Sequence, residues 1–319
     1  MASGKKSNRN SKVAIIGAGF VGSTAAYALL IDGAASEIAL VDVNKEKAEG
    51  EAMDLQHSLQ FRPGTKITFG DKYELCKDAE IVVITAGAHS KPGETRLDLA
   101  AKNSMILKQV VAKIVKYNKD CIILVVANPL DILTYLTLGY SKFPKHRVFG
   151  TGTILDTARF RYLLSQHFGV SPDSVHAYIL GEHGDSSFPV WSTANIAGVK
   201  LAYFKKYNKK SMNKIIAKTK SAAYEIVARK GATHYAIALG IAKVVKAILT
   251  DSNSVIALST YLHNYHGISD VCLSVPCIVN RNGIKEQILM PLDATEKKQL
   301  RKSASIIKGI IKSCVKCRT

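Results

Sequence analysis

Residues 12–22 read Lys-Val-Ala-Ile-Ile-Gly-Ala-Gly-Phe-Val-Gly, a short apolar strand that runs directly into the pattern Gly17-x-Gly19-x-x-Gly22. An apolar helical stretch follows, from Ser23 to Ile31. In such a context the first glycine permits a tight turn, the second lets the backbone approach a pyrophosphate, and the third allows close helix–strand packing. The helix N-terminus offers free N–H groups to the phosphates. This stretch therefore predicts the first βαβ unit of a dinucleotide-binding fold.

A second strand, residues 37–41, supports this interpretation because it ends in Asp42, about 20 residues after the last glycine. A carboxylate at that place accepts hydrogen bonds from a ribose diol and repels a 2′-phosphate, so we expect NAD rather than NADP. Apolar strands at 79–85 and 121–127 continue the alternation of strands and helices. We predict an α/β fold, with a doubly wound parallel (Rossmann) sheet in residues 1–150.

Two features of this half lie where a ligand would bind. Asn128 follows the strand 121–127 and should point into the crevice at the carboxyl end of the sheet. The segment 86–96 contains two glycines and a proline around a polar middle. That composition is typical of a mobile loop, so we expect a lid over about residues 87–97.

The second half, residues 151–319, has a different character, and we expect a substrate and catalytic domain of the α+β type. A long helical region should break at Gly231 and Gly240, and Asn282-Gly283 should turn a β-hairpin. The expected helices are 153–168, 211–249 and 295–316, and the expected strands are 255–262, 271–279 and 284–289.

Composition excludes several classes of protein. The chain has 319 residues, 47% of them hydrophobic, which is typical of a globular protein, and no apolar run approaches the length of a membrane span. The net charge is +19, but the lysines are spread over most helices without interleaved aromatics, so we expect no specific nucleic-acid binding. Without a secretion signal, the six cysteines are expected to be reduced thiols in the cytoplasm. Cys314 and Cys317 have metal-knuckle spacing but no second pair, so we predict no metal site.

Two motifs in the second half carry candidate chemistry. Gly181-Glu-His-Gly-Asp185 follows a short apolar run and places a histidine between glycines, which by itself fits a tight turn with a surface histidine as well as a catalytic loop. Asp156 and Arg159 are three residues apart and share one face of a helix, which by itself fits an ordinary ion pair.

Taken together, these motifs resemble the L-lactate/malate dehydrogenase family, in order and over almost the whole chain. Ser187-Phe-Pro-Val-Trp-Ser192 resembles the lactate rather than the malate branch. The motifs that carry the resemblance are Gly17–Gly22, Asp42, the Arg96 loop, Asn128, Leu155–Arg159 and Gly181–Asp185.

The resemblance implies roles for these residues in hydride transfer between NAD and a small 2-oxo or 2-hydroxy acid. His183 would be the general acid and base, with an ordinary pKa near 6.5 that suits neutral pH. Asp156 would hold its other ring nitrogen. Arg159 would clamp the substrate carboxylate with two parallel hydrogen bonds. The remaining roles would be polarisation of the ketone by Arg96, contact with nicotinamide and substrate by Asn128, and lining of the pocket by Thr233.

Ser90 departs from the family pattern. Six residues before the lid arginine, the family carries Gln in lactate enzymes and Arg in malate enzymes. Serine supplies no cation, so a second substrate carboxylate would be unpaired in a closed site, which disfavours oxaloacetate. Serine is also small, so we expect pyruvate and lactate as the main pair, with tolerance for longer 2-oxo acids.

A second site is implied by Arg161 and His176. In bacterial lactate dehydrogenases that respond to fructose 1,6-bisphosphate, an arginine and a histidine at these places form an anion site between subunits. We therefore expect a homotetramer with this effector. The alternatives are a malate dehydrogenase, a broader 2-oxo acid reductase, an NAD-dependent glycosidase, for which metal ligands are missing from the second half, and a non-catalytic basic binding protein on the same fold.

Overall fold

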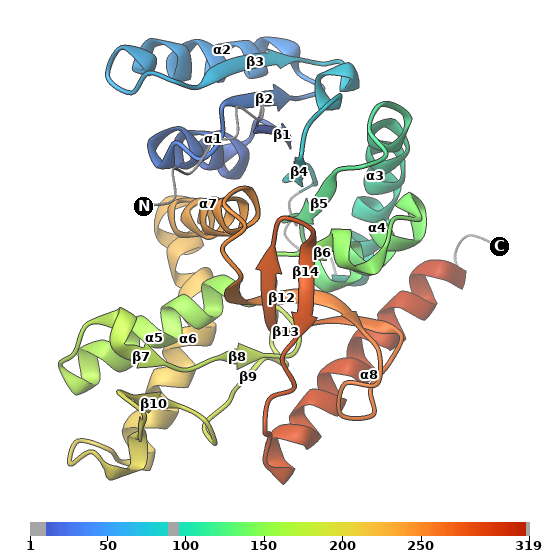
Figure 1. The fold of residues 1–319 in the computed structure, drawn as a ribbon. Helices are drawn as coiled ribbons and strands as arrows, with labels where there is room; N and C mark the ends of the chain where they lie inside the picture. The colour runs from blue at the N-terminus through green and yellow to red at the C-terminus, as the bar shows by residue number, and fades with distance from the viewer. Residues whose placement is uncertain (1–10, 89–95, 317–319) are drawn as a thin grey trace, which may run out of the picture.

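The computed structural model describes residues 11–88 and 96–316. In its first half, strands and helices alternate as the apolar pattern predicts, except that no α-helix separates β3 from β4 (Figure 1). The elements are β1 (Lys12–Ile16), α1 (Phe20–Asp32), β2 (Glu37–Val41), α2 (Lys45–His57), β3 (Lys66–Gly70), β4 (Ile81–Ile84), α3 (Arg96–Tyr117), β5 (Ile122–Val125), α4 (Leu130–Ser141) and β6 (Val148–Gly150).

The second half begins with α5 (Ile154–Phe168) and contains two small antiparallel sheets and a hairpin of longer strands. The short strands are β7 (Val175–His176), β8 (Ile179–Leu180), β9 (Phe188–Pro189), β10 (Asn195–Ile196) and β11 (Val199–Lys200). The remaining elements are α6 (Lys209–Lys230), α7 (Tyr235–Leu249), β12 (Ser254–Leu262), β13 (Val271–Asn280), β14 (Gly283–Gln287) and α8 (Ala294–Lys316).

One sheet of nine strands joins the two halves, in the order β14-β13-β12-β6-β5-β4-β1-β2-β3. Strands β1 to β6 are parallel, and every residue of β2, β4 and β5 is buried, as expected where helices cover both faces. The antiparallel strands β12 to β14 extend this sheet, because Ser259 of β12 pairs with Gly150 of β6. The fold is thus a Rossmann half continued by an α/β half.

The structure corrects one helix break and adds one helix to the sequence prediction. Gly231 ends α6 in the left-handed conformation, as predicted, but α7 runs unbroken through Gly240. A Cβ on Gly240 would lie 3.4 Å from Ile154, so this glycine lets α7 pack closely on α5. Helix α4 was not predicted, although it begins directly after Asn128-Pro129.

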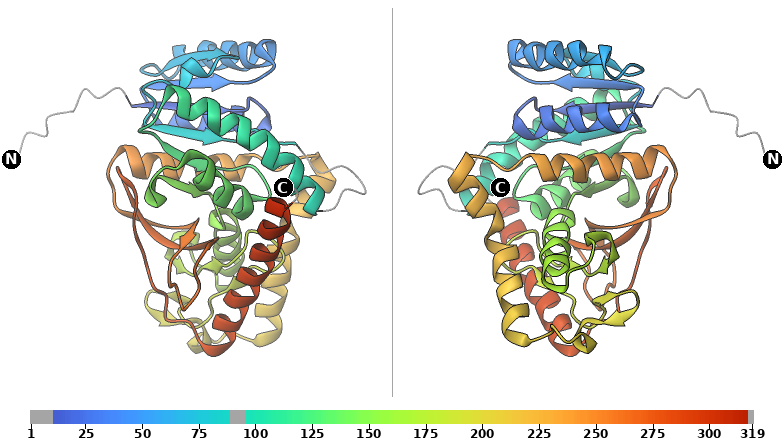
Figure 2. Two further views of the ribbon diagram at one scale, coloured as in Figure 1. Left: turned by 90° about the vertical axis from the view of Figure 1, so that its right-hand side faces the viewer. Right: turned by 90° about the vertical axis from the view of Figure 1, so that its left-hand side faces the viewer.

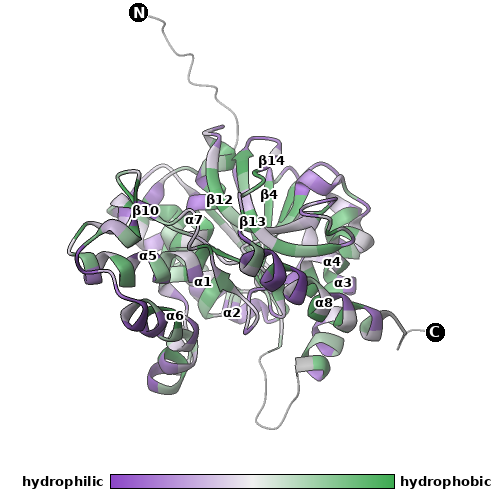
Figure 3. Ribbon diagram, turned by 90° about the horizontal axis from the view of Figure 1, so that it is seen from below, coloured by the Kyte–Doolittle hydropathy of each residue, from purple (hydrophilic) through white to green (hydrophobic). Residues whose placement is uncertain are grey.

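The views from the sides show the first half above the second, with α7 lying across the boundary (Figure 2). Helix α7 packs on α1, so the two halves also meet through helices. The strands are largely hydrophobic, and hydrophilic residues gather on outer helices such as α6 (Figure 3).

Within the described ranges, no helix combines the length and apolarity that a membrane crossing requires. No group of three or more histidine, cysteine or acidic side chains among those residues is placed to hold a metal ion. Cys76, Cys121, Cys272 and Cys277 are buried thiols, Cys314 is buried on α8, and Cys317 lies outside the described residues.

Candidate active site

The three glycines of the loop between β1 and α1 have different surroundings. Gly17 has a φ of +103°, and a Cβ there would lie 2.8 Å from the backbone nitrogen of Ala86. A Cβ on Gly22 would lie 1.8 Å from the carbonyl oxygen of Gly17, so only glycine lets α1 approach the strand end. A Cβ on Gly19 would meet nothing within 4 Å. Gly19 is the N-cap of α1 and makes no side-chain cap, so this helix N-terminus is open toward a ligand.

Asp42, at the end of β2, braces that loop. Its Oδ2 accepts a hydrogen bond of 2.7 Å from the backbone N–H of Ala18, and its Oδ1 accepts one of 2.9 Å from Asn44. A carboxylate has about four lone-pair positions, so both oxygens can still accept from a ribose diol. The open loop and the adjacent acid therefore fit a dinucleotide with a free 2′-hydroxyl.

The loop Gly181–Asp185 is fastened to several elements at once. Gly181, with a φ of +90°, exchanges two backbone hydrogen bonds with Ser274 of β13, at 3.1 and 2.8 Å. The N–H of Glu182 donates to the hydroxyl of Ser303 on α8 at 3.4 Å, and the N–H of His183 donates to Asp131 on α4 at 2.7 Å. The loop is therefore a fixed support for the imidazole rather than a surface turn.

His183 and the two charged residues of α5 form one connected group. Asp156 Oδ2 lies 2.7 Å from His183 Nδ1, and its Oδ1 lies 3.2 Å from Arg159 Nη1. The side chain of His183 is 27% exposed, that of Asp156 14% and that of Arg159 13%. With Nδ1 committed to the carboxylate, Nε2 is the nitrogen left for proton exchange with a ligand.

The charges in this group act on each other's pKa. Burial acts to lower the pKa of His183, but the charge and hydrogen bond of Asp156, aided by the charge of Asp131, raise it above the ordinary value. Burial acts to raise the pKa of Asp156, but His183 and Arg159 lower it below the usual range. The arrangement therefore favours an imidazolium beside a carboxylate, and an imidazolium can donate a proton to a ligand.

The comparisons with known proteins agree with this geometry. Residues 11–150 match the family described as lactate/malate dehydrogenase, NAD binding domain, and residues 153–317 match lactate/malate dehydrogenase, alpha/beta C-terminal domain. The chain belongs to the lactate/malate dehydrogenase family. Its first half is thus the NAD-binding domain of that family.

Relatives within this family are similar over nearly the full chain. The L-lactate dehydrogenase of Acetivibrio thermocellus is 51% identical over 307 residues, covering 95% of this chain and 96% of that protein. The L-lactate dehydrogenase of Bacillus velezensis is 48% identical, covering 95% and 97%. Among solved structures, the minor L-lactate dehydrogenase from Enterococcus mundtii in a ligand-bound form has a TM-score of 0.93 at 42% identity, with 96% and 98% covered. A lactate dehydrogenase from a Medee basin deep-sea metagenome library has the same TM-score at 40% identity, with 96% and 99% covered.

The segment around residues 87–97, which we expected to form a lid, is described only in part. Residues 89–95 of this segment, which include Ser90, lie outside the described residues. Arg96 begins α3, but its side chain is likewise not described. Asn128 is exposed just after β5, and its carbonyl accepts a 2.6 Å hydrogen bond from buried Asn103 on α3. The same Asn103 side chain also forms two hydrogen bonds with the backbone of Ala88, at 2.7 and 3.0 Å.

Thr233 lies in the connection between α6 and α7, half-buried. Its neighbour His234 accepts or donates a 3.1 Å hydrogen bond with Thr24 of α1 and stacks on Phe20, the first residue of that helix. The connection therefore sits beside the glycine loop rather than on the far side of the second half.

Arg161 and His176 have surroundings of their own, separate from the group of His183, Asp156 and Arg159. Arg161 Nε donates to the carbonyl of Ala177 at 2.8 Å, and its guanidinium lies 4.7 Å from the ring centre of Tyr178. His176 is exposed on β7. Arg161 also lines a hollow of about 410 Å³ between α5, α7 and β12, together with Lys243.

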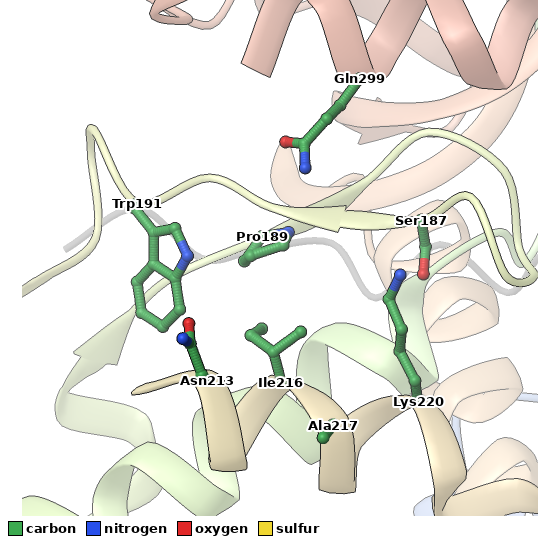
Figure 4. A pocket seen from close by; sticks show the side chains of 8 residues that line it. All are labelled: Ser187, Pro189, Trp191, Asn213, Ile216, Ala217, Lys220 and Gln299. Atoms are coloured by element: carbon green, nitrogen blue, oxygen red, sulfur yellow. The ribbon is translucent and has the colours of Figure 1, made fainter. Parts of the chain in front are cut away.

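A second hollow, of about 350 Å³, lies between the segment 187–191, α6 and α8 (Figure 4). Side chains from three elements surround it in this view: the segment 187–191, α6 and α8. Lys220 of α6, which lines it, donates to the backbone carbonyl of Asp185 at 2.8 Å and thereby supports the end of the loop.

Sequence reasoning missed Asp131, Asn103 and Ser303. These side chains form hydrogen bonds with the backbone of His183, Asn128 and Glu182, respectively. A signal for Asp131 was present, because it is an acid within an apolar stretch directly after Asn128. No comparable signal marked Asn103 or Ser303, since a polar residue on a long helix is usually solvated.

Proposed function

We propose that this protein is an NAD-dependent L-2-hydroxy acid dehydrogenase whose main reaction is the interconversion of pyruvate and L-lactate. The observation that carries the proposal is the connected group of His183, Asp156 and Arg159. It combines a proton donor with a guanidinium suited to a carboxylate, in the half of the chain that continues the NAD-binding domain. The names of the relatives, L-lactate dehydrogenase, support the same substrate.

The residues divide the work of ketone reduction among them. NADH bound at the glycine loop supplies the hydride. Arg159 presents its guanidinium to the substrate carboxylate, and a lysine could not reproduce the two parallel hydrogen bonds. His183 donates the proton on Nε2 to the oxygen that gains negative charge, while Asp156 stabilises the imidazolium beforehand. Arg96, from the lid, polarises the carbonyl, and Asn128 and Thr233 complete the pocket.

The proposal also includes the domain boundaries, the cellular location and the oligomeric state. We assign residues 1–150 to cofactor binding with a lid at about 87–97, and residues 151–319 to substrate binding and catalysis. The protein works in the cytoplasm as a homotetramer. Sedimentation equilibrium tests the assembly, and a monomer at micromolar concentration would contradict it.

The proposed substrate range can be tested by measuring NADH oxidation with a panel of 2-oxo acids. We expect kcat/KM to be highest for pyruvate, lower for 2-oxobutyrate and 2-oxoisocaproate, and lowest for oxaloacetate, because Ser90 offers no cation to a second carboxylate. A preference for oxaloacetate would identify a malate dehydrogenase instead. Salt-sensitive binding of nucleic acid without NADH oxidation would support a basic binding protein.

Regulation by fructose 1,6-bisphosphate is proposed from Arg161 and His176. Arg161 borders an open hollow that Lys243 and Asp173 also line, so two cations and one acid face it. The excess of positive charge supports an anion at this place, and exposed His176 on β7 lies outside this lining. In the proposed tetramer, the positive charges of Arg161 and His176 would face those of a second subunit and repel them. A bisphosphate bound between the subunits would neutralise this repulsion, so it should favour the tetramer. We expect the effector to lower the pyruvate concentration at half-saturation, and Arg161→Gln to abolish that response. Identical saturation curves with and without the bisphosphate would exclude it.

A further inference from the structure

The connection between α6 and α7 is short, and it carries Thr233, which we assign to the substrate pocket. It comprises residues 231–234, between Lys230 at the end of α6 and Tyr235 at the start of α7. His234 is the N-cap of α7, but its side chain makes no capping hydrogen bond to that helix. The half-buried ring instead contacts α1, which belongs to the NAD-binding domain.

The imidazole of His234 has one partner at each nitrogen. Nδ1 lies 3.1 Å from the hydroxyl of Thr24 on α1, and Nε2 lies 3.1 Å from Nζ of Lys230. The ring also stacks on Phe20, with 5.5 Å between the ring centres. His234 therefore links the connection to the first two turns of α1, the helix whose open N-terminus faces the proposed cofactor site.

The donors and acceptors around the ring define its protonation state. The hydroxyl of Thr24 donates to the carbonyl of Phe20 at 2.6 Å, so its oxygen is the acceptor toward His234. A lysine ammonium has donors only, so Nε2 must accept from Lys230. The ring is thus neutral, with its proton on Nδ1. Burial and the charge of Lys230 lower the pKa of His234, which favours this neutral form at neutral pH.

Lys230 closes the connection from its other side. Besides donating to His234, its Nζ lies 3.9 Å from the ring centre of Tyr235. A cation over an aromatic ring is attracted to it, so the last residue of α6 is joined to the first residue of α7. Thr233 lies within this closed loop, directly before the residue that binds α1.

We propose that His234 is a positioning residue for the substrate pocket, which holds Thr233 at a fixed place relative to α1. This inference rests on the proposed function, in which Thr233 lines the pocket and NADH binds at the glycine loop. A threonine held in this way presents a fixed wall to the side chain of a 2-oxo acid. A loose wall would bind the same acids more weakly and less selectively, because ordering it would oppose binding. His234 thus affects KM and substrate preference rather than proton transfer.

The two ring nitrogens can be tested separately. The amide N–H₂ of asparagine can take the place of Nδ1, so His234→Asn can keep the bond to Thr24. The longer glutamine reaches the place of Nε2, so His234→Gln can keep an acceptor for Lys230 instead. His234→Ala keeps neither bond. The matched control is His263→Ala, which removes an exposed histidine that follows β12 in the same half of the chain.

We expect H234A to raise KM for pyruvate about 3–10-fold and to narrow the preference for pyruvate over 2-oxobutyrate, with kcat within about 2-fold of the wild type. H234N should recover most of this loss and H234Q little of it, whereas H263A should match the wild type. If H234A lowers only the thermal midpoint, or if H234N and H234Q are equally impaired, the bond to Thr24 has no positioning role and the proposal is overturned.

A second variant removes the same bond from the side of α1. Thr24→Val should raise KM as H234A does, and the double variant should be no worse than either single one, because both changes remove one shared hydrogen bond. Fully additive effects would contradict the proposal.

The link can also be measured without activity. NMR of the ring nitrogens should show a neutral His234 with its proton on Nδ1 at neutral pH, and backbone order parameters of residues 232–234 should fall in H234A. A proton on Nε2, or unchanged order parameters, would overturn the inference. A wild-type protein that shows this link but does not reduce pyruvate would contradict the proposed function instead.

Discussion

Replacing Asp156 by asparagine isolates the charge that supports the proton donor. Asparagine keeps the size of the side chain and one acceptor for His183 Nδ1, which lies 2.7 Å from the carboxylate. The negative charge is lost, and with it the ion pair to Arg159 at 3.2 Å. Burial acts to lower the pKa of His183 and the Asp156 carboxylate raises it, so the variant should have a lower pKa.

The expected size follows from the distance and the exposure. Two unit charges about 4 Å apart interact by about 4 kcal/mol at an effective dielectric constant near 20. The His183 side chain is 27% exposed, so solvent screening reduces this to about 2 kcal/mol. That corresponds to a roughly 30-fold smaller imidazolium fraction at pH values above the pKa of His183 in the wild type. Loss of orientation adds to this, for a total decrease of about 100-fold in kcat/KM for pyruvate.

The assay is kcat/KM against pH in both directions of the reaction. Pyruvate reduction needs the imidazolium, so its descending limb should move to lower pH in D156N. Lactate oxidation needs the neutral imidazole, so its ascending limb should move the same way and its plateau should lose only the orientation effect.

A matched control is Glu225→Gln on α6. Glu225 pairs with Arg229 at 2.9 Å four residues later, but both side chains are more than half exposed. Removal of an exposed charge of this kind should leave both pH profiles unchanged. The reasoning is refuted if D156N keeps the wild-type limbs, or if E225Q shifts them equally.

Three further substitutions test the guanidinium proposed to bind the substrate carboxylate, the cofactor site, and the loop Gly181–Asp185. Arg159→Lys should raise KM for pyruvate about 10–100-fold because lysine lacks the planar pair of donors, with NADH affinity by fluorescence titration unchanged. Asp42→Ala should weaken NADH binding about 10-fold in the same titration, because the acid no longer accepts from the ribose diol or holds the N–H of Ala18. NADPH binding should weaken less, because the repulsion between the carboxylate and the 2′-phosphate is also lost; equal losses for both cofactors would contradict this. Gly181→Ala should cost about 2 kcal/mol in urea unfolding, because φ is +90° and the new Cβ would lie 2.7 Å from Ser303 Oγ; an unchanged midpoint would contradict this.

The part of the fold that local sequence encodes could be predicted. The glycine loop after β1, the apolar run of β2 after Glu37, and the fully apolar strands β4 and β5 follow from patterns within a few residues. The joining of the halves could not be predicted, because it depends on the pairing of a three-residue strand, β6, with the distant β12. Gly240 was misread for a similar reason, since its closeness to Ile154 is a tertiary contact that overrides helix propensity.

The same distinction applies to the site. The motifs around His183, Asp156 and Arg159 indicated these residues only together with the family resemblance, because each motif alone also fits a turn or an ordinary ion pair. Asp131 acts on a backbone N–H, which every residue except proline possesses, so no residue type on the loop could reveal its partner.

The anchors of the catalytic loop explain why its chemistry requires elements from both halves. Gly181 is held by β13, Glu182 by α8, and His183 by α4 and α5. None of these bonds requires a ligand, so the imidazole is oriented before substrate arrives, and little reorganisation remains for the transition state. Loosening an anchor should therefore lower kcat more than it raises KM, because the lost interaction is with the developing charge and not with the bound ground state.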